Sequence, residues 1–201
     1  MTDTYQTIKD ISQGVYKEKG SKFLSFAIPV QDIEEIKEIL KEYRKEYYDA
    51  RHVCYAYMLG ADRKEFRAND DGEPSGTAGR PILGQINSFD LTNILVIVVR
   101  YFGGILLGTS GLITAYKEAT ADALREAKIE EKTVDIEINI RFEYPLMNEV
   151  MRVIKDTEAN ILNQDYDNDC IMKLSIRKQK ADLLCGKLEK IDGVHLEQDE
   201  V

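Results

Sequence analysis

One short segment concentrates the side chains of this chain that could do chemistry. Residues 69–83 read NDDGEPSGTAGRPIL. Their glycines and prolines exclude an ordinary helix or strand, because glycine opens backbone angles that other residues avoid and proline fixes its own. Ordered polar loops are where binding and catalysis concentrate. We therefore predict a functional site in this segment.

The acidic residues of this segment and the small residues after them suit two different ligands. Clustered carboxylate oxygens suit Mg²⁺, whereas successive backbone N–H groups form a nest for phosphate or carboxylate. Alternatively the carboxylates cap turns or pair with a basic residue, and we favour this role for them. Thr77 could equally be the N-cap of a short helix. We expect no metal and no other cofactor. The cation candidates are Asp70, Asp71 and Glu73, and the anion candidates are Ser75, Gly76, Thr77, Gly79 and Arg80.

A second glycine-rich segment, RYFGGILLGTSGL at residues 100–112, follows an apolar run. Its glycine spacing resembles that of a phosphate-binding loop, but Thr109 stands at the lysine position, which argues against nucleotide hydrolysis by that mechanism. Free N–H groups at a helix start can still hold an anion; tight packing of strand and helix explains the glycines as well, and we favour it. Arg100 could receive a phosphate or form a buried pair with one of the acidic residues. The anion candidates here are Arg100, Gly103, Gly104, Gly108 and Ser110.

His52 lies on a predicted strand and could act as an acid or base near neutral pH. A single strand histidine is more often a satisfied structural residue, and we favour that role. A catalytic dyad with Cys54 is disfavoured, because residues two apart on a strand share a face without pointing at each other. The apolar residues 105–107 are expected in the core; if exposed, they would mark a protein-partner patch.

Composition indicates a globular protein. The chain has 201 residues, 43% of them hydrophobic and 31% charged, with a net charge of −9. This charge argues against coating nucleic acid by bulk electrostatics. The net charge is −6 from residue 133 onward and −3 before it, so a polyanion contact is expected in the first part. Three cysteines without metal-ligand spacing, and a polar start without a signal sequence, favour a cytoplasmic location.

The first part of the chain alternates strands and helices. Asp32 and Glu35 form a capping-box pattern, and residues 93–101 form a β-branched run typical of a strand that is buried on both faces. The predicted elements are a hairpin of residues 14–19 and 22–30, helices at 31–48, 81–87 and 110–128, and strands at 51–59 and 93–101.

The pattern restarts after a charged stretch at residues 127–133, which we predict to be a linker. The later elements are strands at 134–142, 159–166, 170–177 and 194–197 and helices at 145–157 and 179–191, with a turn at Asp167-Asn168-Asp169. The order βαββαβ is that of a ferredoxin-like sandwich. The predicted fold class is α+β, with two α/β-sandwich domains at residues 1–130 and 131–201.

Four blocks of the first domain resemble the IMPACT/YigZ family over about residues 15–127: SKFLSFAIPV, HVCYAY, DDGEPSGTAGRPIL and VVRYFGGILLGTSGL. The second domain is similar to the small C-terminal domain of bacterial members. Ser110 and Thr114 depart from the family pattern, which usually has glycine at the first position and often a basic residue at the second. The resemblance implies a first domain like domain IV of the translocation elongation factor, a fold shared with a ribosomal protein domain and galactokinase-type kinases. Eukaryotic members act in translational control, countering an amino-acid-starvation kinase.

The leading hypothesis is a cytoplasmic, non-catalytic, translation-associated regulator with a role in stress response. It binds RNA, the ribosome or a protein partner through a first-domain cleft and has no membrane segment. The alternative is a Mg-dependent enzyme or a small-molecule anion binder, in which Arg80 and Arg100 hold the anion and Asp71 or Glu73 the metal. Both hypotheses expect the loops at residues 70–80 and 100–111 to face one cleft. The oligomeric state stays open.

Overall fold

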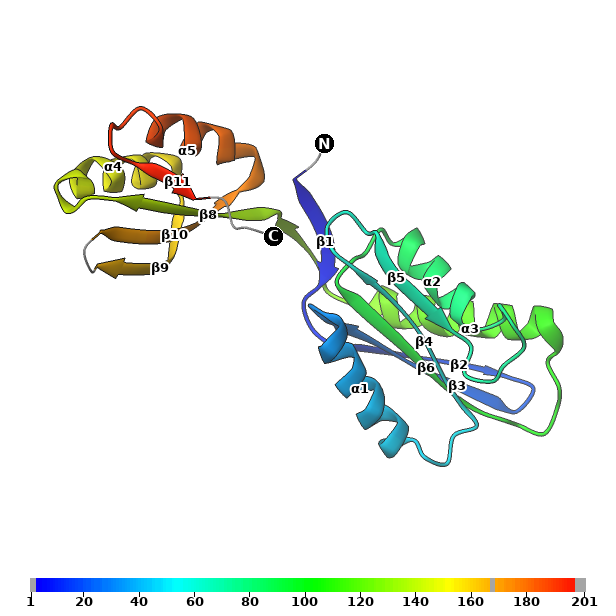
Figure 1. The fold of residues 1–201 in the computed structure, drawn as a ribbon. Helices are drawn as coiled ribbons and strands as arrows, with labels where there is room; N and C mark the ends of the chain where they lie inside the picture. Colours follow the sequence, from blue (N-terminus) through cyan, green and yellow to red (C-terminus); the bar gives the residue numbers. More distant parts are fainter. Residues whose placement is uncertain (1–2, 167–168, 198–201) are drawn as a thin grey trace. The chain divides into compact units, whose positions relative to one another are not determined.

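The computed structural model describes residues 3–166 and 169–197 (Figure 1). Within them the chain forms two compact units. One is Tyr5–Lys132, and the other contains the described part of residues 133–197 together with Asp3 and Thr4. Each unit packs helices on an antiparallel sheet, which confirms the predicted α+β fold class.

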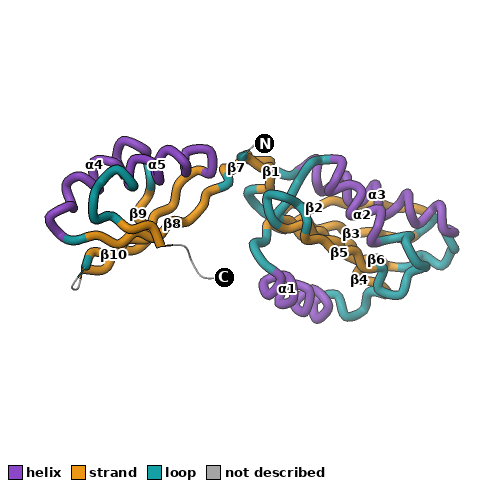
Figure 2. Tube along the Cα trace, turned by 45° about the horizontal axis from the view of Figure 1, so that its top comes forward, coloured by secondary structure: helices purple, strands orange, loops and turns teal. Residues whose placement is uncertain are grey.

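The main sheet of the Tyr5–Lys132 unit has the strand order β2-β3-β6-β4-β5, and all of its neighbours are antiparallel. One helix, α1, covers one face, whereas α2 and α3 cover the other (Figure 2). The strands are β2 (Ser12–Glu18), β3 (Ser21–Pro29), β4 (His52–Leu59), β5 (Glu65–Asn69) and β6 (Ile94–Tyr101). The helices are α1 (Ile33–Glu46), α2 (Gly79–Ser88) and α3 (Gly108–Glu126).

The central strand β6 is buried on both faces, as predicted. Its odd-numbered apolar residues, such as Ile97, join the core under α1, whereas Val96 and Val98 join the core under α2 and α3. β-Branched side chains are stiff and pack well on a pleated surface, which suits a strand in this position. A single apolar run thus supplies both cores of the unit.

Local signals fix the entry to α1 and the first hairpin. The Asp32 carboxylate accepts a hydrogen bond from the backbone N–H of Glu35 at 2.9 Å, and the Glu35 carboxylate accepts one from the N–H of Gln31 at 2.7 Å. Between β2 and β3, Lys19 and Gly20 both have positive φ angles, of 46° and 79°. That combination is typical of a two-residue hairpin turn.

The boundary between the two units falls inside residues 127–133, the stretch that the sequence suggested as a linker. Most of it is strand β7 (Ile129–Thr133), which pairs with β1 (Thr4–Ile8) in a two-stranded sheet. The exposed, charged sequence of β7 lacks the apolar alternation of a half-buried strand, so pairing rather than burial maintains it. Strands β1 and β5 were also not predicted. Helix α3 begins at Gly108, so Ser110 lies inside the helix and does not cap it.

The C-terminal unit has a four-stranded antiparallel sheet in the order β11-β8-β10-β9, with α4 and α5 contributing to its core. This order and the βαββαβ sequence are ferredoxin-like, as predicted. The predicted turn at Asp167-Asn168-Asp169 lies partly outside the described residues. The elements are β8 (Asp135–Phe142), α4 (Met147–Thr157), β9 (Asn160–Tyr166), β10 (Cys170–Arg177), α5 (Ala181–Leu188) and β11 (His195–Glu197).

Asp3 belongs to the C-terminal unit, although the predicted first domain began at residue 1. Its buried carboxylate accepts hydrogen bonds from Nε and Nη2 of Arg177 at 2.6 and 2.7 Å, and its carbonyl accepts one from the N–H of Val134 at 2.7 Å. Such a bidentate pair is among the stronger charged contacts. No helix within residues 3–166 and 169–197 is long and apolar enough to cross a membrane.

Candidate functional site

Three adjacent strands place a row of side chains on the face of the sheet that α2 and α3 cover. Arg100 on β6 lies opposite His52 on β4 and opposite Phe23 on β3. Side chains directly opposite each other on antiparallel strands share a face. The Arg100 guanidinium carbon lies 5.5 Å from the centroid of the Phe23 ring and 5.7 Å from that of Phe102, so both rings make cation–π contacts with it.

Glu73 brings the first glycine-rich loop into this row. Nη1 of Arg100 donates to Oε1 of Glu73 at 2.5 Å, and the Tyr116 hydroxyl donates to the same oxygen at 2.8 Å. The side chains of Arg100 and Glu73 are only 6% and 3% exposed. Buried charges persist when they are paired and hydrogen-bonded. Of the two alternatives for Arg100, the structure therefore shows the buried pair, and the Nη1 group is not available to a phosphate.

Tyr116 connects this ion pair to Cys54. The Cys54 thiol lies 3.3 Å from the Tyr116 hydroxyl and 3.0 Å from the Asp70 carbonyl oxygen. Burial raises the pKa of the Cys54 thiol and that of the Tyr116 hydroxyl above their ordinary ranges, so both groups stay protonated at neutral pH. Because a thiolate is the reactive form, Cys54 is not set up as a nucleophile.

The predicted anion nest is filled by the chain itself. The Asp70 carboxylate accepts hydrogen bonds from the backbone N–H groups of Gly76, Ala78 and Gly79 at 2.8, 3.0 and 2.8 Å. Burial raises the pKa of Asp70, but these bonds outweigh it and hold that pKa below its ordinary value. Asp70 thereby caps the start of α2 from outside the helix. Thr77, a candidate cap, instead donates to the carbonyl of Pro74 at 2.6 Å.

The three acidic residues do not share one ligand site. Asp71 accepts hydrogen bonds from Nη2 of Arg44 and from the N–H of Val53, both at 2.7 Å. Asp70 instead binds the backbone N–H groups of the nest, and Glu73 binds Arg100. The described residues contain no group of three histidine, cysteine or acidic side chains arranged to hold a metal ion. The carboxylates therefore act as caps and ion-pair partners, which was the favoured alternative for them.

His52 has a defined tautomer. Its Nδ1 lies 2.8 Å from the Asp71 carbonyl oxygen, which can only accept, so Nδ1 carries a proton. Nε2 of the same ring lies 3.8 Å from Oε2 of Glu73. His52 thus donates to the Asp71 backbone and lies near the Glu73 carboxylate.

The glycines of the second loop permit close packing and backbone angles that other residues rarely adopt. A Cβ at Gly103 would meet the carbonyl carbon of Gly20 at 1.9 Å, so Gly103 permits the loop to pack against the β2–β3 turn. Gly104 and Gly108 have positive φ angles of 88° and 72°, which glycine adopts at little cost. These are packing and turn roles, as favoured.

Both glycine-rich loops line one cavity of about 340 Å³. This places them as expected, on one cleft. Its charged or titratable lining residues are Arg51, His52, Glu73 and Arg100, and the remainder are Gly72, Pro74, Phe102, Leu106, Leu107, Gly108, Thr109 and Leu112. The other candidates do not line it: Asp70, Asp71, Ser75, Gly76, Thr77, Gly79, Arg80, Gly103, Gly104 and Ser110.

The apolar tip of the second loop corrects a prediction. Ile105 is 56% exposed and Leu106 is 82% exposed, whereas only Leu107 is buried. The expected core role of residues 105–107 is therefore wrong for two of them. Glycines with positive φ angles, Gly104 and Gly108, stand on either side of the stretch. We call Ile105 and Leu106 the tip.

Sequence reasoning missed two residues of the site. Tyr116 falls within the predicted helix at residues 110–128, but its hydroxyl contact to Glu73 was not recognised. The sequence does contain a signal for this contact. A tyrosine on a buried helix face needs a hydrogen-bond partner for its hydroxyl group. Arg51 was assigned only to a strand end, and its guanidinium lies over the Phe102 ring at 5.6 Å from the centroid.

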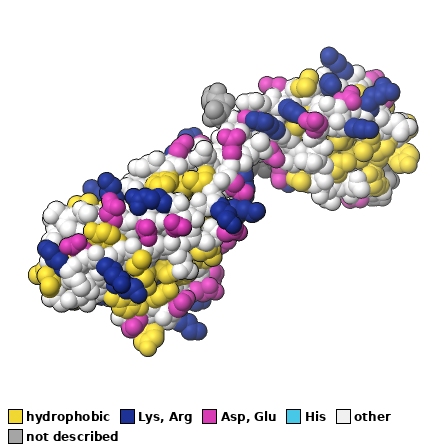
Figure 3. Space-filling view, turned by 180° about the vertical axis from the view of Figure 1, so that it is seen from behind, with side chains coloured by type: hydrophobic (Ala, Val, Ile, Leu, Met, Phe, Trp, Pro, Cys, Tyr) yellow, Lys and Arg dark blue, Asp and Glu magenta, His cyan; other side chains and the backbone are white. Residues whose placement is uncertain are grey.

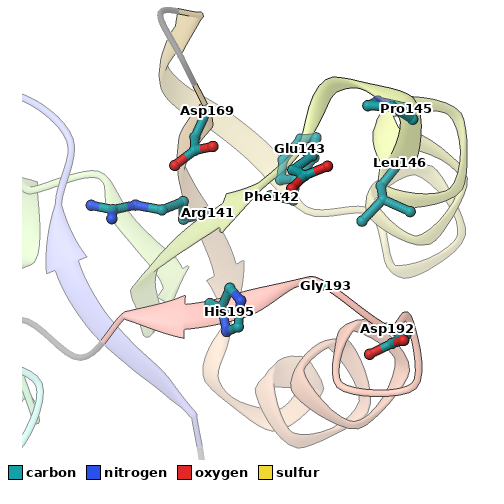
Figure 4. Close-up of a pocket in the computed structure, with 9 residues that line it drawn as sticks. All are labelled: Arg141, Phe142, Glu143, Pro145, Leu146, Asp169, Asp192, Gly193 and His195. Carbon is teal, nitrogen blue, oxygen red and sulfur yellow. The ribbon is translucent and has the colours of Figure 1, made fainter.

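The C-terminal unit has a cavity of about 390 Å³ with a different character. Its charged lining residues are spread around the rim: Figure 4 shows Asp169 and Asp192 at opposite ends, with Arg141 extending away from Leu146. Arg141 pairs with Glu197 on β11 at 2.9 Å. Because these groups are exposed and do not converge, this cavity is the weaker candidate.

The fold and the site together define a class: a two-unit α+β protein whose N-terminal unit holds a buried polar network beneath a small cavity. Residues 19–124 match the family model of the Impact N-terminal domain. The chain is 34% identical over 172 residues to "IMPACT family member YigZ" of Escherichia coli, covering 85% of this chain and 84% of that protein. The chain belongs to the IMPACT family.

Two further comparisons extend this result. "Protein IMPACT" of Rattus norvegicus is 32% identical over 96 residues, which cover 45% of this chain and 30% of that protein. A solved structure titled "Crystal structure of an hypothetical protein" is 30% identical, covers both chains completely and has a TM-score of 0.78. The two-unit architecture thus has an experimentally solved counterpart of similar sequence.

Proposed function

We propose that this protein is a translation-associated regulator that acts by binding a protein partner in the cytoplasm, and that the tip of the second loop is its contact surface. Family membership supports the translational role, because the resemblance described above implies translational control for eukaryotic members. The observation that carries the binding mode is the exposure of Ile105 and Leu106. They lie beside a cavity whose candidate catalytic groups are already hydrogen-bonded to other residues of this chain.

Binding without turnover accounts for the polar groups better than catalysis does. A general base must reach a substrate proton and a nucleophile must be activated. Here Glu73 is held by Arg100 and Tyr116, and the pKa of the Cys54 thiol is raised by burial. The network therefore supports a shaped surface rather than supplying reactive groups.

A protein partner is favoured over RNA. Single-stranded RNA is bound by basic grooves with aromatic stacking platforms, but the tip is aliphatic, and the Phe102 ring is engaged by Arg51 and Arg100. Charges of both signs are interspersed on the face shown in Figure 3, which differs from a continuous basic track. Exposed aliphatic side chains that form a patch on the surface are typical of a contact with another protein.

The test places a photo-crosslinking amino acid at Leu106 in living cells. We expect a covalent product with a discrete protein. In a second experiment the crosslinker replaces Phe102, on the same loop. There we expect Ile105→Ser to reduce the crosslinking yield about tenfold relative to the protein with Ile105, as for an interface anchor. Phe66→Ser, which removes an apolar side chain 57% exposed on β5, is the matched control and should leave the yield unchanged. Crosslinks to RNA alone, or a yield that Ile105→Ser does not change, would contradict the proposal.

A further inference from the structure

The cavity beneath the tip has an apolar body. Pro74, Phe102 and three leucines, Leu106, Leu107 and Leu112, contribute to its lining. Its volume of about 340 Å³ lies at the small end of the range for ligand sites. Such a lining favours a compact branched or aliphatic group.

One wall of the cavity is the start of α3. Gly108 and Thr109, the first two residues of this 19-residue helix, line the cavity. Among the described residues no side chain caps this end, and no acidic residue occurs in its first turn. The first N–H groups of a helix lack partners within it and carry a partial positive charge, so they favour an anion. Asp70 fills the corresponding position at α2, but within residues 3–166 and 169–197 no carboxylate caps α3.

Two arginines supply an independent indication. The Nε atom of Arg100 is buried without a hydrogen-bond partner among the described residues, and its side chain lines the cavity while only 6% exposed. An unsatisfied buried donor is costly, which points to an acceptor that the chain itself does not provide. Arg51 lines the same cavity, is exposed, and forms no ion pair within the described residues.

We propose that this cavity binds a single carboxylate attached to a compact apolar group, as in a branched-chain carboxylic acid or the last residue of a peptide. The carboxylate lies against the start of α3, Arg51 and the Nε of Arg100, and the apolar group lies among the leucines. This proposal deepens the function proposed above and rests on it only in using the same loop.

A carboxylate fits better than a phosphate. The Arg100 charge is already balanced by Glu73, so its Nε supplies a hydrogen bond, and Arg51 and the partial charge of the helix start supply the positive charge for the ligand. That suffices for one negative charge. A second charge on a phosphate would be left in a largely apolar site beside the buried Glu73, and burying an unpaired charge is costly. The loop also lacks the lysine that reaches phosphates in nucleotide-binding loops.

The test is a titration of the full-length protein followed by amide NMR, using 4-methylpentanoate as the ligand. We expect saturable shifts at the amides of Gly108 and Thr109, with a dissociation constant on the order of 1 mM for so small a ligand. The uncharged 4-methylpentanamide should bind at least fivefold more weakly, and 3-methylbutyl phosphate should bind no better than the carboxylate.

Arg51→Gln is the decisive variant. It should weaken carboxylate binding about three- to fivefold, as expected for one exposed charged contact, while binding of the amide stays unchanged. Arg67→Gln is the matched control, since Arg67 is exposed on β5 and lines none of the cavities described above. Equal affinities for carboxylate and amide, tighter binding of the phosphate, or no shifts up to about 20 mM ligand would overturn the proposal.

Peptides distinguish the source of the carboxylate. If the site takes a protein C-terminus, a hexapeptide that ends in leucine with a free carboxylate should shift the same amides, and its amidated form should not. Tighter binding of the peptide than of 4-methylpentanoate assigns the site to a protein C-terminus, and binding of the small acid alone assigns it to a small molecule. Both outcomes support the carboxylate site. These titrations do not depend on crosslinking at Leu106, so each proposal can fail alone.

Discussion

The cavities of the two units have similar volumes, but they differ in the side chains that surround them. The one in the Tyr5–Lys132 unit, of about 340 Å³, is backed by the buried network of Arg100, Glu73 and Tyr116. The one in the C-terminal unit, of about 390 Å³, has exposed charges around its rim, such as Asp169 and Asp192. Volume alone therefore does not identify a site. A site requires side chains that are held in one geometry by other side chains.

Burial explains the difference. The row of His52, Arg100 and Phe23 lies beneath α3 and the glycine-rich loops, so its polar groups must find partners inside the protein. Polar side chains on the exposed face of the C-terminal sheet pair with their strand neighbours, as Lys173 does with Glu137 at 2.5 Å. Such surface pairs add little stability and leave the side chains adaptable.

The largest expected effect is that of Glu73→Ala. Removing this carboxylate leaves the Arg100 guanidinium buried without its partner, so we expect a loss of about 3–5 kcal/mol in the free energy of unfolding of the N-terminal unit. Asp192→Ala, at the rim of the other cavity, should change stability by less than about 0.5 kcal/mol. Urea unfolding, with hydrogen exchange of β4 and β6 to assign the transition, measures both. Similar losses in the two variants would remove the proposed distinction.

Replacing one glycine near each cavity with alanine tests the comparison further. At Gly103 an added methyl group meets the backbone of the β2–β3 turn at 1.9 Å, whereas at Gly193 it meets only Cδ1 of Leu146, at 3.1 Å. Gly193 has a φ of 91°, so an alanine there is strained but not blocked. We expect Gly103→Ala to cost about 2–3 kcal/mol and Gly193→Ala about 1 kcal/mol. Thermal unfolding of both variants checks the order, and a reversed order would contradict it.

The sequence predicts the fold better than the contacts. The β-branched run of β6, the capping box at Asp32 and the turn at Gly20 are local signals, and the elements they predict are present. The charged strand β7 was missed because pairing with β1 maintains it and no apolar alternation marks it. Propensity and pattern describe a segment, whereas strand pairing is a property of two distant segments.

The site shows the same division. The polar loop at residues 69–83 was correctly placed beside residues 100–112, because few other segments concentrate glycine and polar residues. The partner of each side chain could not be predicted. Nothing in the sequence specifies that Asp70 fills the N–H groups that were predicted to bind an external anion, or that Tyr116 reaches Glu73. These contacts depend on the packing of α3 against the sheet.

A smaller effect with a defined pH dependence is expected for Asp70→Asn. Asp70 has a pKa below its ordinary value of 3.8 in the folded protein, so its stabilising contribution is present above about pH 4 and is lost as pH falls through the folded pKa. We expect the substitution to cost about 1–2 kcal/mol at pH 7, as for loss of a helix cap. The difference from wild type should shrink toward pH 2.5 in urea unfolding.

The control for Asp70→Asn is Asp169→Asn at the rim of the C-terminal cavity. Asp169 is exposed, so its replacement should leave stability at pH 7 within about 0.5 kcal/mol of wild type. A cost for Asp70→Asn that stays constant from pH 7 to pH 2.5 would show that its carboxylate charge does not stabilise the nest.

The smallest expected effect concerns RNA. Of the two arginines predicted to carry polyanion contacts, Arg100 is committed to Glu73, and only Arg80 is exposed. We therefore expect Arg80→Ala to weaken RNA binding at low salt by less than threefold, no more than Arg67→Ala does as an exposed arginine on β5. The slope of log affinity against log salt should be about 2 at most, because each neutralised phosphate contributes a little under one. RNA titrations at several salt concentrations measure both quantities. A slope above about 4, or a tenfold loss with Arg80→Ala alone, would favour RNA over the protein partner proposed for the tip.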